Sequence, residues 1–360
     1  MSSPRSSEKS LTYRPWLHRY AWVLLVAILL LIFVGGMVKS TDSGLSVPDW
    51  PNTYGHFMFS YPLDKMIGGI LWEHSHRMIA SVVGVVTFLL TWWIHRTDPR
   101  RWVRQASLWA SISVLVQGVF GGVTVLLYLP AWASTIHGTL AQIYLGLVLL
   151  VLMATGKHWI ERSASHRYGN FSIDRKLVRR SSILVGLILV QLLVGAITRH
   201  IEAGLVIPDF PTMFGGLIPP FSDAAIASAN ETLAREGILA KLRLPEVELF
   251  HMVMHFLHAR VGALVVTVMA LVVAIPVLRD RIGLGGDPGL RRSTVLSLLF
   301  LTLQITLGIL TIYTEKSAVI TSLHVLVGAL LLSAAISMAA HLRSLRSIGG
   351  TSTSPEAGNV

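Results

Sequence analysis

Eight long apolar segments leave this chain few ways to fold. They cover residues 20–39, 68–94, 104–128, 132–155, 178–198, 249–278, 293–313 and 317–340. A run of roughly 20 apolar residues is long enough to cross a lipid bilayer as an α-helix. The sequence therefore predicts an all-α integral membrane protein with eight transmembrane helices, surrounded by membrane lipid.

Composition agrees with this interpretation. Hydrophobic residues make up 52% of the chain and charged residues only 14%, whereas a soluble domain has about 25% charged residues. The first apolar segment is too long for a cleaved signal peptide, and no A-x-A-like cleavage site follows it. The chain has no cysteine, which excludes disulfides, thiolate ligands, iron–sulfur clusters and covalent c-type heme attachment.

The positive charge is distributed as a topology signal. The formal net charge is +11, but 21 of the 30 lysines and arginines lie on the side of the membrane that holds the N-terminus, with 7 of the 19 acidic residues. The opposite side holds the other 9 bases and 12 acids. Because cytoplasmic loops carry an excess of Lys and Arg, we expect a multi-pass protein of the cell (inner) membrane with both termini cytoplasmic. The same distribution argues against a nucleic-acid partner.

The chain also contains an internal repeat. Residues 34–55 (VGGMVKSTDSGLSVPDWPNTYG) align without a gap with residues 194–215 (VGAITRHIEAGLVIPDFPTMFG). Each half has an even number of spans, so both halves enter the membrane from the same side as a parallel repeat. The repeat predicts two tandem four-helix bundles related by a pseudo-twofold axis along the membrane normal.

The repeat sets the expected domain limits. The N-terminal bundle is predicted at 16–156 and the C-terminal bundle at 178–342, with a basic cytoplasmic linker at 157–177 between them. Residues 1–15 and 343–360 are polar and rich in Ser, Thr, Pro and Gly. Such composition predicts disordered cytoplasmic tails.

Two outward loops begin with a shared G-L-x-[VI]-P-D-[WF]-P motif, at residues 44–51 and 204–211. Proline interrupts a helix, so each motif ends or redirects the preceding span. A lid over a cofactor pocket and a plain structural turn would both produce this pattern, and both interpretations stay open. The second loop is longer, and its region 222–244 is predicted to form an amphipathic surface helix.

Four histidines occupy corresponding places in the repeat: His76, His137, His258 and His324. Each lies near the outer start of a different span, roughly 10–15 Å below the outer surface at 1.5 Å per residue. Polar residues inside spans are costly and usually functional. A single histidine there is more often a helix-packing residue, but four at duplicated positions and one depth indicate metal ligands.

The neighbouring residues favour heme over other metal centres. A di-iron carboxylate bundle requires glutamates from four helices, and spans 4 and 8 offer no carboxylate, while His255 stands in span 6 where span 2 has Glu73. Zinc requires three or four convergent ligands. Two imidazoles from facing helices suit axial ligation of heme iron, so each half is predicted to hold one heme.

Several polar residues are predicted around these hemes. Glu73 lies on the same helix face as His76, where a carboxylate can exchange a proton beside a bound cofactor. Arg77 is expected either to pair with a heme propionate or to extend toward water. The other predicted propionate or pocket contacts are Lys39, Arg199, Arg260 and His255.

These residues together resemble the heme A synthase family, membrane enzymes that make heme A for terminal oxidases. The resemblance rests on S-T-D-S-G-L-S-V-P-D-W-P at 40–51, on E-x-x-H-R in span 2, and on one histidine in each of spans 4, 6 and 8. It covers residues 15–345. It implies that the enzyme oxidises the C8 methyl group of heme O to a formyl group.

The resemblance also implies residue roles. His76 and His137 would flank the substrate heme O, and His258 and His324 would ligate heme b as an electron relay. Glu73 matches the acidic residue with an expected catalytic role. This chain departs from the pattern in lacking the cysteine pairs that some members carry, and in reading His-Ala-Arg at 258–260 rather than His-Arg.

Two other functions fit the histidine pairs. One is a di-heme electron carrier, a quinol-linked cytochrome b; the other is a heme transporter. Glu73 and the unequal halves favour the enzyme. The resemblance implies heme O synthase and oxidase assembly factors as partners, whereas the electron donor is unidentified, the oxygen source is undetermined and a homo-oligomer is left open.

Overall fold

The computed structural model describes residues 11–164, 174–219, 221–280 and 287–349. Within these ranges the protein is helical, and eight helices are long and apolar enough to cross a membrane. The predicted all-α membrane fold with eight spans is therefore confirmed. The spans are α1 (Pro15–Ser40), α2 (Gly68–Thr97), α3 (Arg101–Leu126), α4 (Ala131–Thr155), α6 (Arg175–His200), a composite sixth span, α11 (Pro288–Tyr313) and α12 (Ala318–Gly349).

The sixth span is built from three pieces. It consists of α9 (Leu249–Phe256), a π-helical segment (Leu257–Gly262) and α10 (Ala263–Arg279). A π-helical turn holds one more residue than an α-helical turn and often occurs at functional sites. His258 lies within this π segment.

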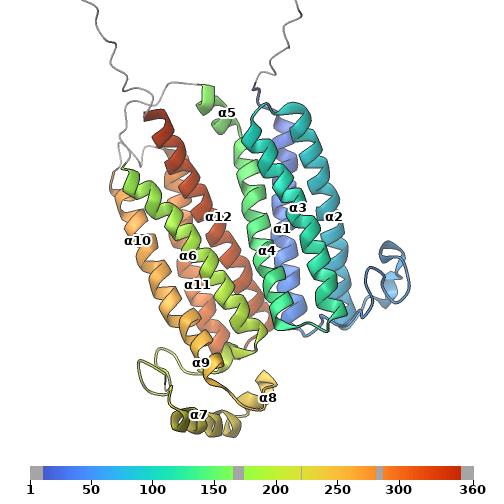
Figure 1. The fold of residues 1–360 in the computed structure, drawn as a ribbon, viewed down its shortest axis with the longest axis vertical. Coiled ribbons are helices and arrows are strands. Elements are labelled where there is room, and N and C mark those ends of the chain that lie inside the picture. The colour runs from blue at the N-terminus through green and yellow to red at the C-terminus, as the bar shows by residue number, and fades with distance from the viewer. Residues whose placement is uncertain (1–10, 165–173, 220, 281–286, 350–360) are drawn as a thin grey trace, which may run out of the picture.

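The spans pack in two groups that follow the chain order. Helices α1 to α4 surround one apolar core that includes Leu24, Ile94 and Leu145. The later spans surround a second core that includes Leu184 and Leu332. The groups meet where α1 and α4 pack against α6 and α12 (Figure 1). The pseudo-twofold relation between them stays a prediction.

The outward faces of the spans are apolar. Large side chains such as Val85, Leu115 and Leu264 are exposed there. A water-soluble monomer rarely exposes so continuous an apolar surface, whereas lipid tails solvate it. The protein is a multi-pass membrane protein.

The connecting segments divide between the two ends of the molecule. The short helix α5 (Lys157–Ala164) lies at the end where α1 begins and α12 finishes, and α7 (Asp223–Arg235) and α8 (Ile238–Leu242) lie at the opposite end (Figure 1). Three 3₁₀ turns, Met58–Ser60, Leu63–Lys65 and Ala203–Leu205, complete the described elements. Helix α7 confirms the surface helix predicted within 222–244, and it buries Ile226, Ala229 and Leu233.

Helix limits extend beyond the apolar runs. The predicted linker 157–177 contains α5, and α6 already begins at Arg175, where the Asp174 side chain caps it by accepting from Lys176 N. Helix α12 continues to Gly349, so the prediction of a disordered tail from residue 343 was wrong for its first residues. Polar residues can continue a helix into water because its backbone hydrogen bonds are internal. Residues 1–10, 165–173 and 350–360 of the predicted tails and linker lie outside the described residues.

Candidate functional site

The structure brings the four predicted histidines together in two pairs. His76 on α2 faces His137 on α4, with ring centroids 6.5 Å apart and an interplanar angle of 69°. His258 in the π segment faces His324 on α12, with centroids 6.2 Å apart and an angle of 89°. Each pair joins two spans of one half.

This spacing fits one iron between two imidazoles. With a metal–nitrogen distance of about 2.0 Å and a ring nitrogen about 1.2 Å from the ring centre, trans imidazoles have centroids about 6.4 Å apart. The Nδ1 atoms of His76, His137 and His324 are buried and make no hydrogen bond with the described residues. Buried polar atoms normally have a partner, so the donor set fits a heme that the chain itself does not supply.

Glycines make room for all four imidazoles. A Cβ atom at Gly35 would lie 2.8 Å from His76 Cε1, at Gly121 3.4 Å from His137 Cε1, and at Gly308 3.1 Å from His324 Cε1. At Gly195 it would lie 3.0 Å from His258 Nδ1. Gly35 and Gly195 correspond in the repeat, as do Gly121 and Gly308. The sequence analysis assigned no role to these glycines; their pairing with the duplicated histidines was the available signal.

Glutamines from neighbouring helices hold these segments. Gln117 Nε2 donates to the backbone oxygen of His137 at 2.8 Å. Gln191 Nε2 donates to the backbone oxygen of His258 at 2.7 Å and lies 3.2 Å from its Nδ1. Gln304 Nε2 lies 3.3 Å from His324 Nε2. The second half therefore restrains its histidine rings more directly than the first.

Glu73 and Arg77 anchor the first outer loop. Glu73 is only 4% exposed; its Oε2 accepts from Val47 N at 2.7 Å and its Oε1 pairs with Arg77 Nη2 at 2.5 Å. Arg77 also donates to the backbone oxygens of Val47, Asp49 and Asn52 at 2.7, 2.6 and 3.2 Å. The structure thus places Arg77 against the loop rather than extended toward water.

The second half repeats this anchor with different chemistry. His255 stands in the place of Glu73, and its Nδ1 lies 3.4 Å from Ile207 N, the repeat equivalent of Val47 N. Arg260 Nη2 approaches the backbone oxygens of Asp209 and Thr212 at 3.3 and 3.4 Å, the equivalents of the carbonyls that Arg77 contacts. A histidine has replaced the carboxylate, but the loop is held at the same points.

The π segment explains the extra residue in His-Ala-Arg. An additional residue in an α-helix would rotate everything after it by about 100°. A π turn absorbs one residue locally, so His258 and Arg260 both keep the places of their first-half equivalents despite Ala259. Gly262 at the end of the segment leaves space that the Gln191 side chain fills.

The shared proline motif forms the same turn twice. Asp49 accepts from the backbone N–H groups of Tyr54 and Gly55 at 2.8 and 2.9 Å, and Asp209 accepts from Phe214 and Gly215 at 2.9 and 3.2 Å. Burial alone would raise the pKa of both carboxyls. The N–H donors have the larger combined effect and hold each pKa below its usual value. Of the two interpretations left open, these contacts favour the structural turn.

Lys39 and Arg199, which correspond in the repeat, reach across to the opposite half. Lys39 pairs with Glu202, which also pairs with Lys316 at 2.6 Å. Arg199 Nη2 donates to Gly36 O at 2.8 Å and to the Ser40 hydroxyl at 2.7 Å. The structure therefore places Lys39 in an ion pair between the halves. Arg199 Nη1, in contrast, is buried without a partner among the described residues, so it remains a predicted contact for a propionate.

Comparison with known proteins adds the family. A sequence model described as COX15-CtaA, cytochrome oxidase assembly protein, matches residues 18–336. Proteins named heme A synthase are similar: one from Hyphomonas neptunium is 26% identical over 57% of this chain, one from Dinoroseobacter shibae 28% over 55%, and one from Rhodopseudomonas palustris 29% over 81%. The matches span 65%, 60% and 80% of those relatives. Because the family match extends over most of the eight-span chain, this protein belongs to the COX15-CtaA family of cytochrome oxidase assembly proteins.

Proposed function

We propose that this protein is a heme A synthase, which oxidises the C8 methyl group of heme O to a formyl group and so supplies heme A to terminal oxidases. The observation that carries the proposal is the presence of two facing, half-buried imidazole pairs with centroids 6.5 and 6.2 Å apart. Relatives that match most of the chain are named heme A synthase.

The proposal assigns one heme to each half. His76 and His137 bind the substrate heme O, and His258 and His324 bind a resident heme b that relays electrons. Heme iron supplies the oxidation chemistry when bound; the chain positions the porphyrins, excludes water and controls protons. The contact of Gln191 with the His258 backbone oxygen holds this segment in place, which suits a permanently held cofactor.

The difference between Glu73 in the first half and His255 in the second supports placing the substrate in the N-terminal half. Among the residues that the structure describes, only that half carries a buried carboxylate, Glu73, within one helical turn of a heme-facing histidine. Glu73 pairs with Arg77 and accepts from Val47 N, so it holds the first outer loop at Val47. The catalytic role of Glu73 stays a prediction, and its contacts favour positioning of the loop and of His76.

The proposal also includes orientation. The histidine pairs lie on the half of the spans near the outer loops, and the basic segments lie at the other end with α5. This arrangement supports cytoplasmic termini, outward-facing heme sites and an inner-membrane location. Heme O, with its apolar tail, would reach the site from the lipid. Heme O synthase, oxidase assembly factors and an electron donor are the expected partners.

The similar geometry of the two pairs favours one second candidate, a di-heme electron carrier. A carrier would retain two identical hemes without altering either. The test is to purify the protein from cells that make heme O but lack another heme A synthase, then extract and chromatograph the hemes. Heme b together with heme O and heme A is expected, whereas two b hemes per chain and no heme A would establish the carrier.

Matched variants separate the two halves. His324→Ala should lose heme b, and His137→Ala should retain heme b but lose heme O and heme A. If both variants lose the same heme, the assignment of one heme to each half is wrong. No heme in the wild-type protein would refute both functions.

A further inference from the structure

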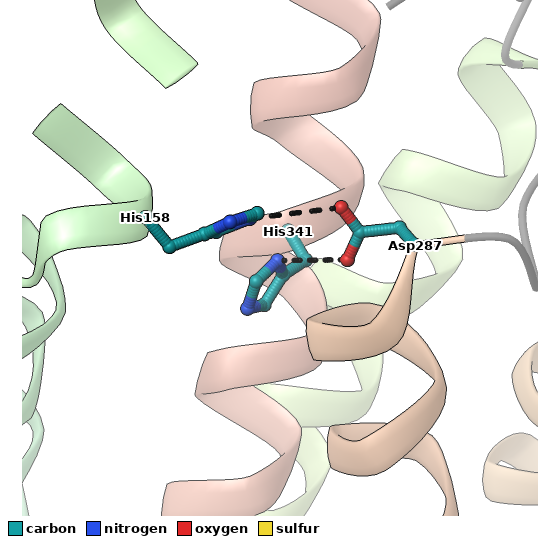
Figure 2. A group of neighbouring side chains, drawn as sticks. All are labelled: His158, Asp287 and His341. Atoms are coloured by element: carbon teal, nitrogen blue, oxygen red, sulfur yellow. Dashed lines mark ion pairs between the residues drawn. The ribbon is translucent and has the colours of Figure 1, made fainter. Parts of the chain in front are cut away.

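A third polar cluster lies at the end of the molecule opposite the outer loops. His158 on α5, Asp287 at the start of α11 and His341 on α12 direct their side chains toward one point (Figure 2). One ligand atom from each residue lies within 4.8 Å of the others. The Asp287 carboxylate is central: its Oδ1 lies 3.4 Å from His341 Nδ1 and its Oδ2 lies 3.8 Å from His158 Nε2.

These distances between ligand atoms are close to those in a tetrahedral metal site. In a tetrahedral site, ligand atoms about 2.1 Å from the metal lie about 3.4 Å from each other. The His341–Asp287 distance already has that value. Imidazole nitrogen and carboxylate oxygen are the ligands that zinc and its first-row neighbours accept.

Burial makes a bound cation more favourable than an empty cluster. Asp287 is 2% exposed and His341 is 6% exposed. His341 Nδ1 makes no hydrogen bond with the described residues although it faces a carboxylate. A buried polar atom is costly without a partner, and a metal ion would satisfy this nitrogen.

The surroundings hold the ligands in place. Asp287 caps α11, because its Oδ1 accepts from Leu290 N at 2.7 Å, which fixes the carboxylate plane. Gly289 leaves room for the imidazole, since a Cβ there would lie 2.7 Å from His341 Nε2. The Trp159 ring packs on His341 with centroids 5.1 Å apart. The half-exposed His158 leaves the site open to solvent for a fourth ligand.

We infer that His158, Asp287 and His341 form a binding site for a divalent transition-metal ion of the zinc class, with water as the remaining ligand. His158 follows directly on α4 of the first half, whereas Asp287 and His341 belong to the second half. The ion therefore links the two halves at the end distant from the hemes. The site is independent of the heme chemistry proposed above.

The test uses full-length protein purified in detergent without a polyhistidine tag. After chelator treatment and dialysis, the protein is titrated with Zn²⁺ against a chromogenic chelator, and bound zinc and heme are measured separately. One zinc per wild-type chain is expected, with thermal stabilisation on binding. Mg²⁺ should not displace it, because magnesium requires octahedral oxygen ligands.

Three variants make the test specific. Asp287→Asn keeps a residue that caps helices well but removes the anionic ligand, and His158→Ala removes a half-exposed ligand with little loss of packing. Each should weaken zinc binding by at least the ~10- to 100-fold that loss of a supporting group costs at metal sites, with heme content unchanged. His95→Ala, an exposed histidine of α2, should bind zinc like the wild type.

Two results would overturn the inference. One is a wild-type protein that takes up no zinc at micromolar free Zn²⁺. The other is equal binding by wild type, Asp287→Asn and His158→Ala, which would place the zinc elsewhere, including at heme-free histidine pairs. Displacement of zinc by Mg²⁺ would show that the ligand class is wrong.

Discussion

The glycines beside the histidines allow a sharp test of the proposed heme sites, and Gly195 offers the best contrast. A Cβ at Gly195 would lie 3.0 Å from His258 Nδ1 and 3.1 Å from His258 Nε2. Carbon contacts are most favourable at about 3.5–4.0 Å. The nearest ring atom, His258 Cε1, would lie closer still. In Gly195→Ala the imidazole must therefore withdraw by about one ångström, although Gln191 holds the same residue from the side.

The expected cost follows from overpacking. Forcing an extra methyl group into a packed site costs about 1–3 kcal/mol, which corresponds to a loss of about 5- to 150-fold in affinity. This cost should appear in heme b binding, since the displaced ring is an axial ligand in the proposed site. Gly186→Ala is the control, because it lies on the same helix α6 and its Cβ would meet nothing within 4 Å.

The assay is a titration of heme-depleted protein with heme, followed by the absorption and electron paramagnetic resonance spectra of the complex. Gly195→Ala should bind heme more weakly and show a smaller low-spin fraction. Gly186→Ala should bind normally, and its unfolding temperature should rise slightly, because alanine favours helix over glycine by about 1 kcal/mol. Equal heme binding by the two variants would refute the argument that Gly195 makes room for the ligand.

Three further predictions concern the loops and the interface. Glu73→Ala leaves Arg77 buried without its anion and should reduce the free energy of unfolding by about 3–5 kcal/mol; an unchanged melting temperature would contradict this. Burial raises the pKa of Glu202, but ion pairs with two lysines outweigh it and hold the pKa below its usual 4.5. A carboxyl whose pKa is lowered in the folded state stabilises the fold at pH values above its unfolded-state pKa. This stabilisation is lost as the pH falls through the folded-state pKa. The melting temperature should therefore fall more steeply below about pH 4.5 in wild type than in Glu202→Gln, and parallel curves would count against the ion pairs. Deletion of Ala259 should convert the π segment to α-helix and retain heme b, whereas deletion of Ala270 from regular helix should abolish heme binding; equal outcomes would disprove the account of the π turn.

The contacts of Glu73 with the first outer loop could be predicted from the sequence only in part. The spacing Glu73-x-x-His76 predicted two groups on one helix face, and the helix places them there. It could not show that Glu73 binds Val47 N, because that contact joins positions 26 residues apart through a turn whose shape depends on Asp49. For the same reason the sequence could not show that Lys39 forms an ion pair with Glu202 of the other half, and its contact with a propionate stays a prediction.

The His-Ala-Arg sequence at 258–260 gives an example in which the structure preserves a contact despite a change in spacing. In sequence, the inserted Ala259 is a departure from the His-Arg pattern, and Arg260 is still predicted as a propionate or pocket contact. In the structure, a π turn absorbs Ala259, and Arg260 contacts the same two loop carbonyls. Helix type within a span depends on packing against neighbours such as Gln191, and no local pattern reveals it.

The sequence by itself determined the membrane class, the eight spans, the repeat and the positions of the four histidines along them. These properties depend on apolar length, helical period and charge placement, which are local and which a bilayer restricts strongly. Only the tertiary structure decided which side chains meet: the ring pairs, the glycines that receive them, and the cluster of His158, Asp287 and His341. Residues 158, 287 and 341 have no shared pattern in the chain. They become neighbours only because α5 follows α4, α4 packs against α12, and α12 packs against α11.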